Sequence, residues 1–511
     1  MKKHLSIAFL FIPVLLSAAP QDSHVFFNVR AFGAKGDSTA IETDAINRAI
    51  DAAAAAGGGT VYFPAGNYLS FSLHLKSNIT LFLDNGAYLI GAASDKGSGG
   101  YDAPEPNPAD KYQDFGHSHW HNSLIWGENL ENIAIIGQGW IIGNGLTREG
   151  RPTPGLGNKT IALKLCRNVI LKDFTVLHGG HFCLLATGVD NLTIDNVKLD
   201  TNRDGFDIDC CRYVHMSNCS VNSPFDDAIV LKSSYALGFA RMTENVTITG
   251  CSVFGFDIGT FLDGTYQRNN FNRVPDRGAV TGRIKLGTES NGGFRNITIS
   301  NCTFEFCRGL ALETVDGAYL EDITVSNITM RDCMAAPFFM RIGARLRGPE
   351  GTVVGKARRI NISNIIAYSA DPKYASLILG LPGYDIEDVK MSNITVLVKG
   401  GAAKEQADII VPELEKGYPD PTNFGAIPAY GLYIRHAKNI ELMNVELKVE
   451  NEDLRPPFIL EDVKGASFIN VKAPHAQGVP TFVLKNVTDF KTVQCGSVPD
   501  KEIDKADNLK L

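Results

Sequence analysis

The stretch TNRDGFDIDCCRYVHMSNCSVNSPFDDAIVLKSS, Thr201 to Ser234, contains parts of two consecutive sequence repeats with acidic residues at matching places. The first repeat starts at Asn191 and the second at Tyr213, and Asp204 and Asp226 lie equally far from these two starts. Repeats of this kind stack on one another, so equal offsets place side chains in one column. We therefore expect the two carboxylates to occupy the same position in adjacent layers of the fold.

A short phrase rich in β-branched residues recurs along the chain, with spacings that grow where segments are inserted. The repeats start at Asn132, Asn168, Asn191, Tyr213, Asn245, Asn296, Asp322, Arg359, Asp388 and Asn439. A short base period of this kind with longer insertions is typical of a solenoid, and the units have strand rather than helix periodicity. The leucine scaffold of leucine-rich repeats is missing. The repeats predict an all-β fold, a single-stranded right-handed parallel β-helix.

An asparagine follows at a fixed offset from most repeat starts, and a glycine does so once. These residues are Asn196, Asn218, Asn301, Asn327, Asn364, Asn393 and Asn444, with Gly250 as the exception. Asparagine and glycine both tolerate left-handed backbone, so the pattern predicts a ladder of turn residues. The alternative is N-glycosylation, because Asn-Ile-Thr and Asn-Val-Thr triplets recur, but the repeat favours the turn ladder.

One amphipathic helix precedes the strand repeats. Its apolar face consists of Ala45, Ile46, Ala49, Ile50 and Ala53, and the glycines 57–59 end it before a strand at Thr60 to Phe63. A single helix ahead of a strand-only chain is expected to cap the open end of the stack. We expect the β-helix domain to span residues 20–475 and a C-terminal cap or tail to span residues 476–511.

Residues 1–19 have the features of a secretory signal peptide. Two lysines precede an apolar run from Leu5 to Leu16, and small residues follow it. No other run approaches the length of a membrane span, so we expect a periplasmic or secreted protein, and a monomer. The net charge of −7 argues against nucleic acid as a partner.

The 10 cysteines follow the pattern of the core rather than that of a disulfide framework. Cys219, Cys251 and Cys302 stand where other repeats have Val197 or Ile328. Cysteine is among the most buried residue types, so we predict buried free thiols.

Five segments are too long for a single turn of the repeat, and they are rich in aromatic residues and proline. They are residues 91–121, 233–242, 255–282, 345–356 and 400–430. Long loops on a rigid solenoid usually form the binding surface, and aromatic rings stack well on sugars. Packing of these loops on each other is an equally good interpretation of any single aromatic residue.

The ionisable residues gather at one offset of the repeat. The offset that Asp204 and Asp226 share gives His181 in the preceding repeat, with Asp227 alongside and Lys232 downstream. Carboxylates this close raise one another's pKa, so one can donate a proton while another stays ionised. Glycosidic cleavage requires this division of labour. A structural role in capping turns is a better interpretation of Asp207 and Asp209 than of the three clustered acids. For those three acids, calcium chelation is a stronger alternative to catalysis than turn capping is.

These residues resemble a known family. Asn202-Arg203-Asp204-Gly205 and Asp226-Asp227-Ala228-Ile229 look like the Asn-x-Asp and Asp-Asp motifs of the polygalacturonases, glycoside hydrolase family 28, and Gly287-Thr288-Glu289 is similar to a later motif. The resemblance covers about Phe27 to Met330. It implies inverting hydrolysis on a parallel β-helix, and because water activation is assigned to aspartates we expect no cofactor or metal. It further implies Asp226 as the general acid, with Asp204 and Asp227 activating water.

The chain also departs from the family. Thr281-Gly282-Arg283 stands where the family has Gly-His-Gly, and Ala311-Leu312-Glu313 stands where it has Arg-Ile-Lys. The string from Arg283 to Lys285 belongs to an earlier turn of the repeat. These losses favour a pectic substrate other than plain polygalacturonan, such as rhamnogalacturonan or a decorated galacturonan. Our candidate substrate-binding residues are His181, Asn202, Lys232, Arg283 and Glu313.

Two other functions fit parts of the pattern. A calcium-dependent polysaccharide lyase on the same fold would need a base such as Lys232 or Arg203. A non-catalytic carbohydrate-binding solenoid would keep the aromatic loops but has no need for stacked acids. The leading hypothesis is an exported glycoside hydrolase that cleaves a pectic polysaccharide or oligosaccharide.

Overall fold

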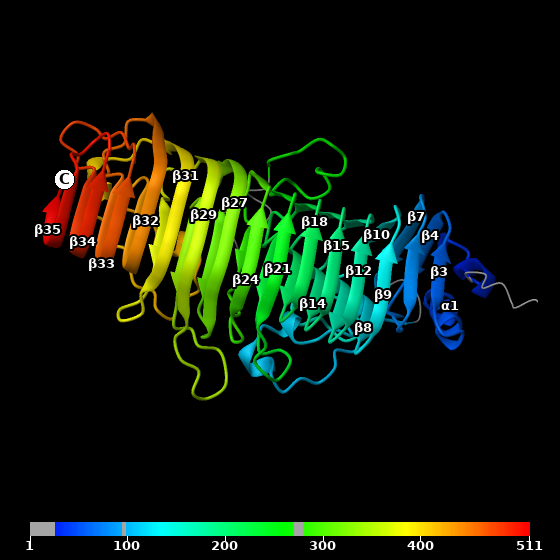
Figure 1. Ribbon diagram of the computed structural model, residues 1–511. Coiled ribbons are helices and arrows are strands. Elements are labelled where there is room, and N and C mark those ends of the chain that lie inside the picture. The colour runs from blue at the N-terminus through cyan, green and yellow to red at the C-terminus, as the bar shows by residue number, and fades with distance from the viewer. Residues whose placement is uncertain (1–25, 95–98, 270–279) are drawn as a thin grey trace, which may run out of the picture.

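The structure is a computed structural model, and it describes residues 26–94, 99–269 and 280–511. The expected signal peptide at residues 1–19 lies outside the described residues. The described chain forms one elongated stack of strands, with helix α1 (Thr43–Ala55) near one end and β35 (Lys501–Lys510) at the other (Figure 1). This arrangement confirms the predicted parallel β-helix.

Each coil contributes three short strands, and each strand pairs in parallel with its equivalent in the next coil, so three rows result. The first row contains β5 (Leu73–His74), β8 (Ser123–Glu128), β11 (Lys159–Lys164), β14 (Phe182–Thr187), β17 (Asp204–Asp209), β20 (Ile229–Lys232), β23 (Ile284–Leu286), β26 (Leu310–Thr314), β28 (Phe338–Ile342) and β30 (Ser376–Leu379). The second row contains β1 (Phe26–Asn28), β3 (Gly59–Phe63), β6 (Ile79–Leu83), β9 (Glu131–Ile136), β12 (Arg167–Lys172), β15 (Asp190–Asp195), β18 (Arg212–Ser217), β21 (Thr243–Thr249) and β24 (Phe294–Ser300). The third row contains β2 (Asp37–Ile41), β4 (Gly66–Ser70), β7 (Ala87–Gly91), β10 (Trp140–Ile142), β13 (Thr175–Leu177), β16 (Lys198–Asp200), β19 (Ser220–Asn222), β22 (Ser252–Phe254) and β25 (Thr303–Glu305).

Later coils fuse short strands into long ones. These are β27 (Tyr319–Cys333), β29 (Lys356–Ser369), β31 (Ile386–Gly400), β32 (Leu432–Asn451), β33 (Phe458–Ile469) and β34 (Phe482–Val493). We expected the β-helix to end at residue 475, but β34 still stacks in parallel on β33, and only β35 lies antiparallel. Short 3-10 helices interrupt the loops at Val29–Phe32, Asp110–Tyr112, Phe115–His117, Lys404–Asp408 and Pro421–Phe424.

The core consists of aliphatic columns inside the coils, because every second strand residue points inward. Cys219, Cys251 and Cys302 lie in this core beside Val197 and Ile328. All 10 cysteines, each in the described part of the chain, are buried free thiols. The prediction of buried thiols is therefore confirmed.

The predicted asparagine ladder is present at the turns. Asn196, Asn218 and the other predicted asparagines have positive φ, between 53° and 58°. Their side chains bond from coil to coil, as where Asn364 Nδ2 donates to Asn327 Oδ1 at 3.1 Å and Asn393 Nδ2 donates to Asn364 Oδ1 at 3.1 Å. Each amide satisfies its neighbour, which explains why one residue type repeats at this turn.

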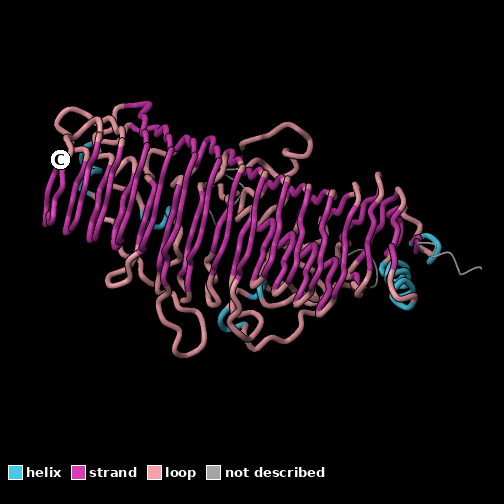
Figure 2. The backbone as a smooth tube through the Cα atoms, viewed as in Figure 1, coloured by secondary structure: helices cyan, strands magenta, loops and turns pink. Residues whose placement is uncertain are grey.

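Helix α1 packs on β1, β3 and β5 with the five predicted apolar residues buried, which confirms the helix. No helix among the described residues is long and apolar enough to cross a membrane. The loops gather along the edges of the stack (Figure 2). Two of them, the cyan loop before β8 and the yellow-green loop after β28, hang from the same side in Figure 1.

Candidate active site

The three predicted acids lie at one turn of the β-helix, where the chain passes from the third row to the first. We call this the entry turn; it comprises residues 178–181, 201–203 and 223–228 in three successive coils. Asp226 and Asp227 lie in the turn before β20, and Asp204 is the first residue of β17. All three acids therefore lie in one region of the β-helix, as the repeat predicts.

The predicted pairing of Asp204 with Asp226 is wrong by a single position. Asp200 pairs with Asn222, but Phe206 pairs with Ile229, so the segment between Asn222 and Ile229 holds one residue more than the segment between Asp200 and Phe206. The amide of Gly205 donates to the carbonyl of Asp227, which places Asp227 opposite Asp204. The repeat offset counts residues across this turn, and the turn differs in length between the two coils. The strand register after the turn is therefore shifted by one residue.

The predicted column position of His181 is wrong for the same reason. Phe182, and not His181, pairs with Asp204. The Nδ1 of His181 lies 2.6 Å from the carbonyl oxygen of Arg148, and burial together with Arg203 holds the pKa of His181 well below its usual range. His181 is therefore a neutral, buried residue on the flank of the acids.

The acids form one tight cluster. One oxygen from each of Asp204, Asp226 and Asp227 lies within 4.8 Å of the others, and each residue is exposed by 5% or less. Burial and the neighbouring Asp226 raise the pKa of Asp204 to about 8. Arg203 Nη2 donates to Asp226 Oδ2 at 2.6 Å, a charge-assisted hydrogen bond. At neutral pH Asp204 therefore holds a proton, beside a carboxyl group that is paired with an arginine.

Two cations reach the cluster from the next coil. Arg283 Nε donates to Asp227 Oδ1 at 2.8 Å, and Lys285 Nζ lies 3.3 Å from Asp227 Oδ2. The predicted place of this string, one coil before Ala311-Leu312-Glu313, is confirmed because β23 pairs with β20 on one side and with β26 on the other. Lys285 was not among the predicted site residues, although the alternation of Arg283 and Lys285 about the inward Ile284 puts both on one face.

Glu313 lies behind these cations rather than beside the acids. Its carboxylate is 3.6 Å from Lys285 Nζ and 3.9 Å from Arg283 Nη2, and burial raises the pKa of Glu313 to about 7. Tyr418 covers the same lysine, since its hydroxyl accepts a hydrogen bond from Lys285 Nζ at 3.2 Å. The loop of residues 401–431 thus brings an aromatic ring to the site, as expected of a long loop.

Lys232 lies beneath the acids in a second charged layer. Its Nζ donates to Asp207 Oδ2 at 2.6 Å, contacts Nε2 of His117 and lies 4.0 Å from Glu289 Oε2. Burial lowers the pKa of Lys232, but Asp207 and Asp204 outweigh it and the net direction is far upward. No sequence signal pointed to His117, which comes from the loop before β8.

Asn202 is half-buried in the entry turn, beside Arg203. Among the described residues, the side-chain oxygen of Asn202 is buried and accepts no hydrogen bond. A buried acceptor without a donor is costly, and a bound hydroxyl group would satisfy it. Asn202 is therefore well placed to bind a substrate.

Three groups of these residues have ligand atoms close enough to hold a metal ion, within the described chain. They are Asp114-His117-Glu289, His117-Asp204-Asp207 and Asp204-Asp226-Asp227, so His117 links the first two groups and Asp204 links the last two. The ammonium of Lys232 already contacts the second group, and Arg203, Arg283 and Lys285 contact the third. These cations supply the positive charge that calcium would bring, so the donor set does not fit a calcium ion well.

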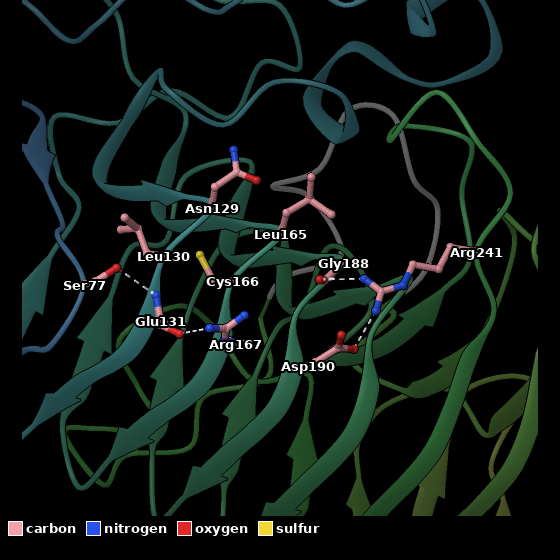
Figure 3. A pocket seen from close by; sticks show the side chains of 10 residues that line it. All are labelled: Ser77, Asn129, Leu130, Glu131, Leu165, Cys166, Arg167, Gly188, Asp190 and Arg241. Atoms are coloured by element: carbon pink, nitrogen blue, oxygen red, sulfur yellow. Dashed lines mark hydrogen bonds and ion pairs between the residues drawn. The ribbon is translucent and has the colours of Figure 1, made fainter.

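A separate pocket of about 410 Å³ lies at the turns that lead from the first-row strands to the second-row strands (Figure 3). These turns are at the opposite ends of the first-row strands from the entry turn. Its charged groups pair with each other. Arg241 Nη2 lies 2.5 Å from Asp190 Oδ1, and Arg167 bonds to Glu131. Because these pairs leave little charge for a ligand, the acid cluster remains the candidate active site.

Family models match two parts of the chain. The model described as "Rhamnogalacturonase A/epimerase, pectate lyase-like" matches residues 26–146, and the model "Right handed beta helix region" matches residues 159–338. The second match includes all three acids of the cluster. It also confirms the predicted handedness of the β-helix.

Curated relatives and solved structures agree with these matches. The chain is 24% identical over 396 residues to a "Probable polygalacturonase" of Vitis vinifera, which covers 73% of this chain and 74% of that protein. It is 34% identical over 174 residues to an "Exo-poly-alpha-D-galacturonosidase" of Dickeya chrysanthemi, covering 32% of this chain and 27% of that protein. The fold matches the Family 28 exopolygalacturonase of Yersinia enterocolitica with a TM-score of 0.62 and 19% identity, over 88% of this chain and 78% of that one. The resemblance carried by the aspartate motifs is thus confirmed: the chain is similar in sequence to polygalacturonases and has the fold of a right-handed parallel β-helix.

Proposed function

We propose that this protein is an exported glycoside hydrolase that cleaves a pectic polysaccharide or oligosaccharide. The relationship to polygalacturonases supports a polygalacturonase-like glycoside hydrolase. The observation that carries the proposal is the cluster of Asp204, Asp226 and Asp227, in which the protonated Asp204 lies beside two carboxyl groups that are each paired with an arginine. Hydrolysis of a glycosidic bond needs one acid and one base in this arrangement.

In the proposed mechanism Asp226 protonates the leaving oxygen, and Asp204 and Asp227 activate a water molecule. In the free site the shared proton rests on Asp204, while Arg203 binds Asp226. A bound sugar that draws Arg203 away from Asp226 lets the proton pass from Asp204 to Asp226. Asp204 is then ionised and accepts a proton from the attacking water, which keeps the proton count balanced.

Inversion at the anomeric carbon is part of the proposal. The oxygens of the cluster lie within 4.8 Å, closer than the roughly 6.5–9.5 Å of most inverting pairs. We propose that two carboxylates, Asp204 and Asp227, share the water on one side of the bond. Proton NMR of the first product formed reads the anomer directly. A product that retains its configuration contradicts this step and leaves hydrolysis itself in place.

The proposed substrate is rhamnogalacturonan or a decorated galacturonan rather than plain polygalacturonan. Arg283 and Lys285 lie against Asp227 and Glu313, so their charge is already balanced within the protein. Little positive charge is left there for a galacturonate carboxylate. The match to a rhamnogalacturonase A/epimerase family model supports the same substrate class.

We assign different roles to the five predicted binding residues. Asn202, with its unbonded side-chain oxygen at the entry turn, contacts the sugar. Arg283 pairs with Asp227 and is itself close to Glu313, so both act on the charge around Asp227. Lys232 lowers the pKa of Asp204. His181 supports the flank of the site through Arg148.

A calcium-dependent lyase is the weaker alternative. Its base would be Lys232 or Arg203, but Lys232 is buried and held as an ammonium ion by Asp207, and Arg203 is paired with Asp226. A non-catalytic binding solenoid is weaker still, because burying a protonated aspartate among carboxylates costs stability without helping to bind a sugar. We further propose that the enzyme needs no cofactor or metal and acts as a monomer, since the last strand, β35, alternates charges that discourage edge pairing.

The test is a screen of the purified protein against polygalacturonan, rhamnogalacturonan and methylated galacturonan oligosaccharides, read by mass spectrometry and by absorbance of unsaturated uronides. We expect saturated products from rhamnogalacturonan or the decorated chains. Unsaturated products would establish the lyase instead. The absence of products from any of these glycans, with Asp226→Asn equally silent, would refute the hydrolase proposal.

A further inference from the structure

A second cavity lies near the C-terminal end of the stack, at the red end of Figure 1. Its volume is about 440 Å³, and it lies where the loop segment 404–410 meets β33 and β34. Ile459 and Val483, both buried, line it from the sheet. Ile410 lines it from the loop and is 89% exposed. A concave apolar surface that stays open to solvent is typical of a ligand site.

The cavity carries more positive than negative charge. Lys404, Lys485 and Lys510 line it, whereas Asp408 is its one acidic residue. Lys485 lies 3.9 Å from Glu461 on the exposed surface. Among the described residues, no carboxylate lies within ion-pair distance of Lys404 or Lys510. These two ammonium groups are therefore available to an anionic ligand.

The cavity lies on the same outer face of the β-helix as the acid cluster. Strand registers join Lys285, which contacts Asp227, to Ile459 and Val483 in one outward column. Between Lys285 and Ile459 the column passes through Ala311, Phe339, Leu377 and Tyr433. These five strand steps of about 4.8 Å amount to roughly 24 Å. A sugar chain that follows the axis of the stack therefore meets both sites.

One loop connects the two sites. The loop between β31 and β32 covers the column between them with apolar residues, among them Val411 and Phe424. The hydroxyl of Tyr418 in this loop accepts a hydrogen bond from Lys285 at 3.2 Å, and the segment 404–410 of the same loop lines the cavity. A polymer bound at both sites therefore crosses the surface of this loop.

We propose that the cavity binds a remote segment of the acidic polysaccharide that is cleaved at the acid cluster. The inference rests on the proposed function, which makes the ligand a chain that carries uronate carboxylates. At the acid cluster, Arg283 and Lys285 are balanced by Asp227 and Glu313, so little positive charge is left there for such a carboxylate. The lysines of the cavity supply this charge. Binding of a remote segment makes the encounter with the acids intramolecular, which raises the affinity for long chains.

The test measures binding of polygalacturonan and rhamnogalacturonan to the Asp226→Asn protein, so it does not depend on cleavage. In this background, Lys404→Gln with Lys510→Gln removes the two unpaired charges of the cavity. The matched control is Lys198→Gln with Lys438→Gln, two exposed lysines outside the cavity. We expect the cavity pair to weaken binding about tenfold at low salt, and the control pair to weaken it no more than about twofold.

Circular dichroism checks that both double variants fold. Equal binding of both folded double variants to the two polymers would overturn the proposal, and so would a lack of binding to either polymer by the Asp226→Asn background. Neither outcome bears on whether the parent cleaves a glycosidic bond. Conversely, a parent without any hydrolytic activity would refute the proposed function and leave the measured binding in place.

Two further ligands identify what the cavity recognises. Polyglutamate with the same number of carboxylates cannot also occupy the acid cluster as a sugar does, so it should compete only at about tenfold higher concentration. Equal competition would show a general polyanion surface and overturn the assignment to a sugar chain. Oligosaccharides too short to span roughly 24 Å should bind the cavity pair and the control pair alike. A loss for short chains as large as for the polymers would contradict the link between the two sites.

Discussion

The substitution Asp204→Asn separates a catalytic acid from a structural one, because it should lower activity and raise stability at the same time. In the unfolded chain this carboxyl group ionises near pH 3.8, whereas in the folded site its pKa is about 8. Between these values the folded state binds a proton that the unfolded state has lost. Raising the pH therefore destabilises the folded protein through Asp204.

The size of the effect follows from that difference in pKa. Each pH unit between about 4 and 8 costs the parent roughly 1.4 kcal/mol through this group. From pH 5 to pH 7 the free energy of unfolding of Asp204→Asn should thus gain roughly 2.7 kcal/mol relative to the parent. Asparagine cannot accept a proton from water, so kcat should fall by about 10² to 10⁴.

The assay is urea unfolding of both proteins at pH 5 and pH 7, together with initial rates. The matched control is Asp51→Asn. Asp51 is an exposed residue of α1 whose ion pair with Lys76, at 3.7 Å, is on the surface, so this variant should show no such pH dependence relative to the parent. An Asp204→Asn protein whose stability relative to the parent is the same at both pH values would refute the assignment of the proton. Retention of most activity would remove Asp204 from the mechanism.

Four further predictions can be tested with the same assays. Asp226→Asn should lower kcat by about 10² to 10⁴ and leave the circular dichroism spectrum unchanged; substantial residual activity would exclude it as the acid. Lys232→Met should raise the pKa of Asp204 above about 8 and move the alkaline limb of kcat/KM upward, whereas Lys232→Arg should restore it; an unmoved limb in both would contradict the charged layer. His181→Ala and His181→Gln should lower activity without moving either limb, since the buried imidazole is neutral and bonds to Arg148; a shifted limb would give it a proton-transfer role. Activity should survive exhaustive chelation, and a loss that calcium alone reverses would favour the lyase.

Much of the fold could be read from the sequence because a β-helix is periodic. Each coil repeats the same inward aliphatic positions and the same asparagine turn, so the strand rows, the buried cysteines and the capping helix α1 all follow from local pattern. The end of the stack lies further along the chain than residue 475. Asn470 Nδ2 still donates to Asn444 Oδ1 at 2.8 Å, and β34 pairs with β33 through its backbone.

The acids could be found because their motifs are also periodic. Their register could not be found, because the turn beside them departs from the period. The motifs around Asp204 and Asp226 recur in neighbouring coils, which fixes the region of the surface. The exact partner of Asp204 depends on the length of the entry turn, and one extra residue there exchanges Asp226 for Asp227. A count of residues from one repeat start to the next cannot show where within the coil an extra turn residue lies.

What the sequence by itself determined is the set of features that repeat: the coil, its core, its turn ladder and the three carboxylates. What only the tertiary structure decided is everything brought in from outside the repeat. His117, Arg347 and Tyr418 reach the site from loops that lie far apart in the sequence, and no period links them to the acids. The charged contacts of Lys232, Glu289 and Lys285 depend on those loops, because contacts between distant segments are properties of the assembled site.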